Sequence, residues 1–187
     1  DIHAGLFGDL GILSFNGNKT ITTGGGGMMI TNDENLAARA KYVTTTAKRP
    51  HPWEYFHDEV GFNYRLPNIN AALGVAQMES LPAFLEDKRK LAEEYRAFFE
   101  TIPEIEFITE PHRCRSNYWL NAIKLPDRKT RDEFLEYTNN NGIMTRPVWE
   151  LMHRLPMYEA CPRGELPVAE ELADRIVNIP SSPRVKA

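Results

Sequence analysis

Short apolar runs separated by polar or glycine-rich connections open the chain. The runs at residues 10–15 and 28–31 have the length and composition of strands. Asp33 then precedes apolar residues that recur with the 3.6-residue period of a helix, and an aspartate in that place is a good N-cap. We therefore predict a strand, a glycine-rich connection, a second strand and a helix that ends near Thr44.

The middle of the chain combines an irregular segment with a long helical pattern. Residues 48–66 are rich in proline, histidine and aromatic residues, and loops of this length inside compact domains are usually functional. Small residues recur through 68–78, which predicts a helix suited to close packing. Pro82 permits a new helical start, and the apolar period continues from there to about Glu100.

The last third reads as a small α+β domain. Apolar runs predict strands at 105–108, 118–123 and 143–145. A helix is predicted over 130–140, where an Asn-Asn-Asn-Gly run ends the pattern, and a short helix over 168–176.

Composition excludes several classes of function. The chain has 187 residues, a net charge of −4 and 42% hydrophobic residues, with its Lys and Arg dispersed, which argues against nucleic acid as a partner. No apolar run has membrane-spanning length, so we expect no membrane partner and a cytoplasmic protein. Cys114 and Cys161 are too few and too far apart for a disulfide scaffold or a zinc site.

Lys19 lies in the segment with the strongest chemical signal. The polar, hydroxyl-rich residues 14–23 surround it, and four consecutive glycines, Gly24–Gly27, follow. A lysine used for covalent chemistry needs a held backbone, a desolvated amine and nearby groups that bind anions. The glycines suit a tight turn or a close backbone approach, and no Gly-Lys-Ser/Thr ends them as in a P-loop.

Three segments, in the same order along the chain, resemble motifs of one enzyme family. Residues 8–15, Lys19, the glycine run and residues 29–33 look like the lysine region of the DegT/DnrJ/EryC1/StrS sugar aminotransferases, which are pyridoxal-phosphate (PLP) enzymes. Residues 61–77, which open with Gly-Phe-Asn-Tyr-Arg-Leu-Pro, and residues 146–158 match further motifs of that family. Together the matches extend over nearly the whole chain.

The resemblance implies an α/β fold, the PLP-dependent transferase fold type I of the aspartate aminotransferase kind. Residues 1–80 would be the C-terminal part of the large PLP-binding domain, 81–101 a long linking helix, and 102–187 the small α+β domain. Family members carry a long half before this point, with the phosphate-binding helix and the aspartate that pairs with the pyridine nitrogen. We therefore expect a C-terminal portion of a longer enzyme, inactive by itself and unable to bind PLP tightly.

The resemblance also implies the reaction. An amino group would pass from an amino acid, glutamate, to a nucleotide-linked keto-deoxysugar, in a homodimer whose active sites are shared. The sequence Ser-Phe-Asn-Gly-Asn-Lys and residues 50–55 resemble the LegC-like branch of the family. Members of that branch aminate UDP-linked 4-keto-6-deoxy-N-acetylhexosamines on routes to nonulosonic acids or bacillosamine. Many relatives carry Glu-Gly-Gly where this chain has Gly24–Gly27, so an acidic group is missing here.

The resemblance implies a cofactor site formed by four residues. Lys19 would bind PLP covalently and move a proton as the catalytic base. Ser14 would donate to the cofactor phosphate, and Asn63 would reach the phosphate of the neighbouring subunit. Arg65 would position that loop or meet an acidic partner. The structural alternatives are a surface lysine, an ordinary strand serine and an asparagine that holds its own turn.

Sugar-nucleotide binding has its own candidates. Aromatic faces contact sugars or uracil through apolar area, and arginine suits a diphosphate. The candidate substrate-binding residues are His51, Trp53, Tyr55, Arg146 and His153. The aromatic residues could instead anchor a dimer interface or a core. No metal site is predicted, because the histidines and acidic residues of 51–59 lack tight ligand spacing.

Two other classes of function stay open. One is a sugar dehydratase of the same fold, in which a histidine replaces the lysine, and Lys19 argues against it. The other is a non-catalytic remnant or binding module. The sugar, the position and stereochemistry of amination, and the amino donor are not fixed by the sequence.

Overall fold

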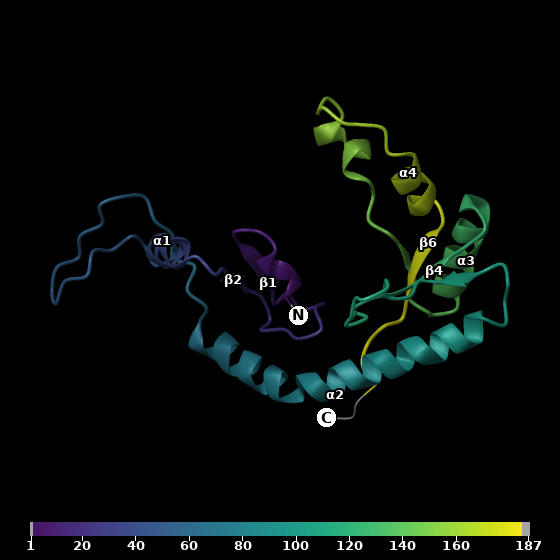
Figure 1. The fold of residues 1–187 in the computed structure, drawn as a ribbon, viewed down its shortest axis with the longest axis horizontal. Coiled ribbons are helices and arrows are strands. Elements are labelled where there is room, and N and C mark those ends of the chain that lie inside the picture. Colours follow the sequence, from purple (N-terminus) through teal and green to yellow (C-terminus); the bar gives the residue numbers. More distant parts are fainter. Residues whose placement is uncertain (1, 185–187) are drawn as a thin grey trace. The chain divides into compact units, whose positions relative to one another are not determined.

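The computed structural model describes residues 2–184 (Figure 1). The chain divides into two compact units, residues 1–82 and residues 83–187. Within the described residues, no helix combines the length and the apolar character needed to cross a membrane.

The first unit opens with a hairpin. After the short 3₁₀ helix η1 (Ala4–Leu6), strand β1 (Gly11–Ser14) pairs antiparallel with β2 (Gly27–Ile30), so that Gly11 faces Ile30 and Ser14 faces Gly27. The strands predicted at 10–15 and 28–31 are therefore confirmed. Position 11 requires glycine because the backbone of Gly5 approaches it closely. A Cβ at Gly11 would lie 2.1 Å from the Gly5 carbonyl oxygen.

Helix α1 (Glu34–Thr44) follows the hairpin where the sequence predicts it. The Asp33 carboxylate accepts hydrogen bonds from the backbone N–H groups of Asn35 at 2.8 Å and Leu36 at 3.1 Å. These bonds satisfy donors that have no partner inside the helix, which fixes where the helix begins.

An extended loop, residues 45–67, connects α1 to the next helix and is tied back to α1. Arg39 forms a two-pronged ion pair with Glu59, one prong of which measures 2.6 Å. Asp58 accepts from the Tyr42 hydroxyl and from Arg49 Nε, and these two bonds, in that order, lower the pKa of its carboxyl. The predicted long loop is thus an ordered one.

Helix α2 (Asn68–Phe99) is a single helix with Pro82 inside it. The prediction of a separate helix start at Pro82 is wrong. The φ angle of proline is compatible with a helix, and the residue costs the helix only one backbone hydrogen bond. A helix whose turns on both sides keep their hydrogen bonds can therefore continue through it. The boundary between the two units falls immediately after Pro82, and the three-part division at 80 and 101 stays a prediction.

The second unit is built on a four-stranded antiparallel sheet. Its strands are β3 (Glu106–Phe107), β4 (Asn121–Lys124), β5 (Arg146–Pro147) and β6 (Ile176–Ile179), in the order β3-β4-β6-β5. Figure 1 shows β4 and β6 lying side by side. The central position of β6 makes it the strand that joins β4 to β5.

Three predictions for this unit need correction. The strand expected at 118–123 begins only at Asn121, and the strand expected at 143–145 is displaced to β5. The helix expected over 168–176 ends earlier, as α4 (Pro167–Ala173), and β6 follows it directly. The apolar residues of β6 extend the helical pattern in the sequence, but their pairing with two other strands decides their conformation.

Helices complete the second unit around one core. Helix α3 (Arg128–Asn140) is capped by Asp127, whose carboxylate accepts from Thr130 N at 2.8 Å, close to the predicted 130–140. Two 3₁₀ turns, η2 (Met152–Arg154) and η3 (Pro156–Tyr158), lie between β5 and α4. The buried core consists of Ala92, Phe99, Phe107, Ile123, Leu125, Val177 and Ile179.

One buried cation joins α2 to the sheet of this unit. Lys88 is 2% exposed, and its Nζ donates to the carbonyl oxygens of Ser181 at 2.5 Å and Trp119 at 3.3 Å. Burial lowers the pKa of its ammonium, while the negative charge of Asp87 acts in the opposite direction. The two bonds hold the chain segments before β4 and after β6 against α2.

Substituting Lys88 with methionine should destabilise the second unit. The aliphatic stem is kept, but the two carbonyl oxygens lose their ammonium donor, which costs about 1–3 kcal/mol. Chemical denaturation of Lys88→Met measures the loss. The exposed Lys90 on the same helix gives the matched control, since Lys90→Met should stay within about 0.5 kcal/mol of the wild type. Equal stability of both variants would refute the role given to Lys88.

Candidate active site

The connection between β1 and β2 is a closed loop that carries Lys19. Its base is formed by Phe15, whose N–H donates to the Gly26 carbonyl at 3.0 Å. The Phe15 carbonyl in turn accepts from the Thr22 hydroxyl at 2.9 Å and from Thr23 N at 3.1 Å. These bonds join the two limbs of the loop, so the backbone around Lys19 is held at both ends.

Lys19 and Ser14 both belong to this hairpin. The Lys19 N–H donates to the Asn16 carbonyl at 3.0 Å, which forms a turn, and the residue is half-buried. Ser14 is exposed at the end of β1, and its Oγ accepts from Asn16 N at 3.5 Å. The structure thus brings the predicted lysine and serine onto one short element.

The glycine run forms the turn that leads into β2. Gly24 and Gly26 have φ values of 78° and 106°, a region that residues with a Cβ rarely adopt. At Gly26 a Cβ would also lie 2.8 Å from a methyl group of Leu66. The expected positive-φ turn is therefore met at both glycines, and the expected close approach is met at Gly26.

An open pocket of about 740 Å³ lies beside the glycine run. Arg65 and Tyr64, from the loop before α2, share its lining with Gly25–Gly27, with β-strand residues and with Asn70. The complete lining is Ile12, Gly25, Gly26, Gly27, Met28, Met29, Thr44, Tyr64, Arg65, Leu66, Pro67 and Asn70. Arg65 is thus the predicted site residue that the fold brings to the glycine run.

Asn63 lies on the same loop, two residues before Arg65. Its backbone forms an isolated antiparallel bridge with Thr45, and the neighbouring Tyr64 N–H donates to the Thr44 carbonyl at 2.9 Å. The backbone of Asn63 is thus fixed, while its side chain is exposed.

The aromatic candidates of the loop form an exposed group. His51 Nδ1 accepts from the N–H of Glu54 at 2.9 Å, and its ring meets Trp53 edge-on with the ring centroids 4.8 Å apart. Lys48 Nζ lies 3.9 Å from the centroid of the Tyr55 ring. Trp53 is 76% and Tyr55 82% exposed, so neither anchors the core of this unit.

Arg146 and His153, the remaining candidates, belong to the second unit. Arg146 is exposed on β5, and Trp149 beyond it stacks on Trp119 with the ring centroids 6.1 Å apart. His153 behaves differently: its side chain is 9% exposed, and its Nε2 lies 2.9 Å from Glu170 Oε1 on α4. Its role toward a substrate stays a prediction.

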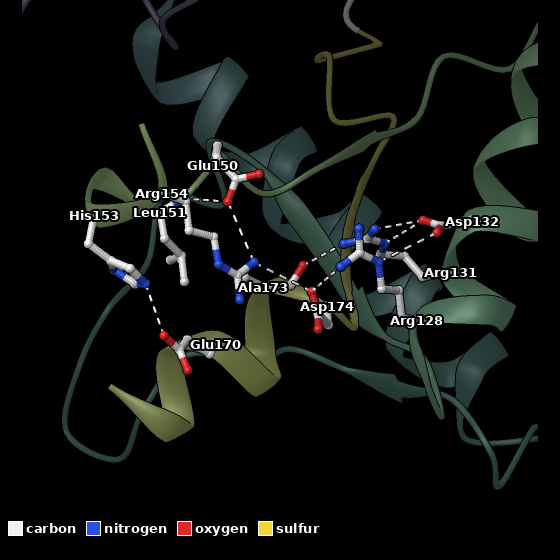
Figure 2. A network of polar contacts seen from close by, with 10 residues as sticks. All are labelled: Arg128, Arg131, Asp132, Glu150, Leu151, His153, Arg154, Glu170, Ala173 and Asp174. Carbon is white, nitrogen blue, oxygen red and sulfur yellow. Dashed lines mark hydrogen bonds and ion pairs between the residues drawn. The ribbon is translucent and has the colours of Figure 1, made fainter. Parts of the chain in front are cut away.

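Figure 2 shows that His153 is one member of a polar network that fastens η2 to α4. Arg154 lies 3.5 Å from Glu150 and 3.6 Å from Asp174, which also meets Arg128 at 3.4 Å. The network holds the segment after β5 in place. Sequence reasoning missed it, because the partners come from three separate elements.

Sequence reasoning also missed two residues on α2 that contact the Lys19 loop. Asn70 and Gln77 hydrogen-bond to Thr23 and Thr22, with Gly74 between them on the helix. Both residues lie inside the segment 61–77 that resembles the family, and their spacing of seven places them on one helix face, but neither signal points to a contact with the Lys19 loop.

Metal chemistry finds no support in the described side chains. No group of three or more His, Cys, Asp or Glu residues among residues 2–184 is arranged to hold a metal ion. The chemically distinctive groups of the first unit are instead an amine, a hydroxyl, a guanidinium and a glycine-rich backbone.

Known proteins are similar to this chain in sequence and in fold. GDP-perosamine synthase of Escherichia coli O157:H7 is 37% identical over 181 residues, which are 97% of this chain and 49% of that protein. The putative pyridoxal phosphate-dependent aminotransferase EpsN of Bacillus subtilis is 36% identical over 156 residues, 83% of this chain and 40% of that protein. The chain thus spans about half the length of the curated relatives that it matches.

A solved structure agrees with these relatives. The aminotransferase TlmJ from Streptoalloteichus hindustanus superposes with a TM-score of 0.87 at 26% identity, covering 96% of this chain and 48% of that one. The sequence also matches the DegT/DnrJ/EryC1/StrS aminotransferase family over residues 1–187. This chain therefore belongs to that family of PLP-dependent sugar aminotransferases, which have the type I transferase fold.

Proposed function

We propose that the protein carrying this chain is a PLP-dependent aminotransferase that moves an amino group from glutamate to a nucleotide-linked keto-deoxysugar. The observation that carries the proposal is Lys19, held in a closed loop between β1 and the glycine run. Family membership gives this lysine its chemical context.

The residues of the hairpin fit the cofactor. Lys19 supplies the amine for covalent attachment, and the exposed Ser14 hydroxyl supplies a donor for a phosphate group. Arg65 supplies a positive charge in the pocket beside the glycine run. When bound, PLP provides the electron sink that transamination requires.

Lys19 has a second task as a base. Once the amino donor has displaced it from the cofactor, its Nζ would carry a proton between the α-carbon of the donor and the C4′ carbon of the cofactor. The bonds at the base of the loop limit the movement of the backbone, so the amine moves through its own side-chain torsions. A histidine at this position would favour the dehydratase of the same fold, and the lysine here favours transamination.

For the substrate, we propose a UDP-linked 4-keto-6-deoxy-N-acetylhexosamine. The proposal is supported by the sequence Ser-Phe-Asn-Gly-Asn-Lys and by residues 50–55. The exposed rings of His51, Trp53 and Tyr55 in that segment offer faces for a sugar or uracil. Arg146 offers a charge for the diphosphate, and His153 would act from its place beside Glu170. The E. coli relative is named for a GDP-linked sugar, so the nucleotide must be tested directly.

We also propose that two copies of the protein form a homodimer with shared sites. Apolar side chains on the first turns of α2 are exposed, with Ile69 at 86% and Val75 at 61%. Large exposed apolar surfaces of this kind mark interaction sites. The proposal is also supported by Asn63, whose backbone is fixed and whose exposed side chain would serve a neighbouring subunit.

Product analysis tests the function. The full-length protein is incubated with glutamate and with either a UDP-linked or a GDP-linked 4-keto-6-deoxysugar, and the products are weighed by mass spectrometry. We expect an amino sugar, formed at least about tenfold faster from the UDP-linked N-acetyl sugar. Faster amination of the GDP-linked sugar would overturn the substrate assignment. Cofactor binding without amination of either sugar would favour the non-catalytic alternative.

A further inference from the structure

Helix α2 presents a polar face to the base of the Lys19 loop. Asn70 Nδ2 donates to the Thr23 carbonyl at 2.5 Å, and Gln77 Oε1 accepts from Thr22 N at 3.3 Å. Both bonds are partly buried, so water competes for them less than at the surface. Residues seven apart lie on one face of a helix, which lets the two amides grip adjacent residues.

Gly74 lets the helix come this close. A Cβ at Gly74 would lie 2.9 Å from the Thr23 methyl group, too close for any ordinary contact. The glycine lies between Asn70 and Gln77 on the same helix face. The sequence of α2 therefore combines one small residue and two amides at the point where the loop meets the helix.

The gripped residues are also the ones that close the loop. Thr22 and Thr23 donate to the Phe15 carbonyl and thereby join the two limbs on either side of Lys19. The position of this junction sets where the limb that returns from Lys19 lies. Contacts from α2 to Thr22 and Thr23 are therefore contacts to the support of the lysine.

We propose that Asn70 and Gln77 are positioning residues for Lys19, which they hold through Thr22 and Thr23. The proposal rests on the function proposed above for Lys19. The two amides have different duties, because Asn70 faces a carbonyl and must donate, while Gln77 faces an N–H and must accept. If Thr22 and Thr23 were released, Lys19 Nζ could move away from the position that it needs for the reaction. Small displacements of a catalytic group lower the catalytic rate strongly.

The different duties define the variants. Asn70→Asp removes the donor and sets a carboxylate against the Thr23 carbonyl. Gln77→Leu removes the acceptor at similar volume, whereas Gln77→Glu restores an acceptor oxygen. Glu79→Gln, at an exposed position of the same helix, is the matched control.

Two readouts are needed, and the first does not involve the cofactor. In the cofactor-free, full-length protein, hydrogen exchange of peptides covering residues 15–26 should be roughly fivefold faster in Asn70→Asp and Gln77→Leu. Exchange in the peptide that contains β4 should be unchanged, which shows that the second unit stays folded. Gln77→Glu should bring the exchange rate back toward that of the wild type.

The second readout is kinetic and spectroscopic. With PLP added, Asn70→Asp and Gln77→Leu should lower kcat by about tenfold or more, with a smaller change in KM for the sugar. The pH midpoint of the visible band of the lysine-bound cofactor should shift in the same two variants. Glu79→Gln should match the wild type in all three measurements.

The outcomes separate the inference from the proposed function. Faster exchange of the loop with unchanged kcat and an unchanged pH midpoint would overturn the inference, because the contacts would then only stabilise the fold. Unchanged exchange would overturn it as well. If the wild-type protein shows no band of lysine-bound cofactor, the proposed function fails, and the exchange data alone then decide whether Asn70 and Gln77 hold the loop.

Discussion

Replacing Lys19 with alanine is expected to abolish amino transfer by the full-length protein while its fold is retained. In the function proposed above, Lys19 supplies both the covalent attachment of PLP and the base that moves a proton. Loss of the base alone lowers rates by about 10²–10⁴-fold. Loss of the attachment point adds to this, so turnover should fall below detection.

The fold should survive this change because the loop is held by backbone groups. The bonds of Phe15 with Gly26 and Thr23 do not involve the lysine side chain. Circular dichroism and the melting temperature of Lys19→Ala should therefore stay close to those of the wild type. Lys41→Ala, an equivalent change at an exposed position on α1, should leave turnover unchanged. A Lys19→Ala protein that transaminates at the wild-type rate would refute the assignment.

The second large effect is expected from mixing two inactive variants. In the proposed shared site, Lys19 of one subunit would work with Asn63 of the other, so Lys19→Ala and Asn63→Ala subunits should complement each other. Random mixing makes half of the dimers hybrids, and each hybrid keeps one intact site. About a quarter of the wild-type activity should return, because closed two-fold dimers pair the same surfaces in every combination.

Size measurement decides how the mixing result is read. The mixture should elute as a dimer, and activity should rise with the time allowed for subunit exchange. Mixing Lys19→Ala subunits with themselves is the control and should restore nothing. A protein that stays monomeric and shows no complementation would contradict shared sites.

Locally encoded elements could be predicted from the sequence. Strands β1 and β2 and helix α1 follow from short apolar runs and from Asp33, whose cap bonds form within three residues. The structure places α3 near its predicted bounds for the same reason, through the cap at Asp127. In each case the deciding contacts lie close together in the chain.

Elements decided by distant contacts could not be predicted in the same way. Strand β6 lies between β4 and β5, which come from segments far earlier in the chain, and its apolar residues alone also fit a helix. Pro82 signals a helix start locally, yet the helix runs through it. Local pattern carries no information about which pairing partners will be present.

In the candidate site too, contacts between neighbours in the chain could be predicted and contacts between distant segments could not. The sequence singled out Lys19, Ser14 and the glycine turn, because they are neighbours in the chain. The grip of Asn70 and Gln77 on the loop depends on the approach of α2, and the contact of His153 with Glu170 depends on the docking of η2 against α4. Such contacts require the tertiary structure.

Mapping the cofactor onto one lysine is the most direct test of this account. The full-length protein is loaded with PLP, reduced with borohydride to make the attachment permanent, and digested for mass spectrometry. We predict that the added mass lies on the peptide that contains Lys19 and on that residue within it. Added mass on a different lysine, or on none, would contradict the central claim that Lys19 binds the cofactor.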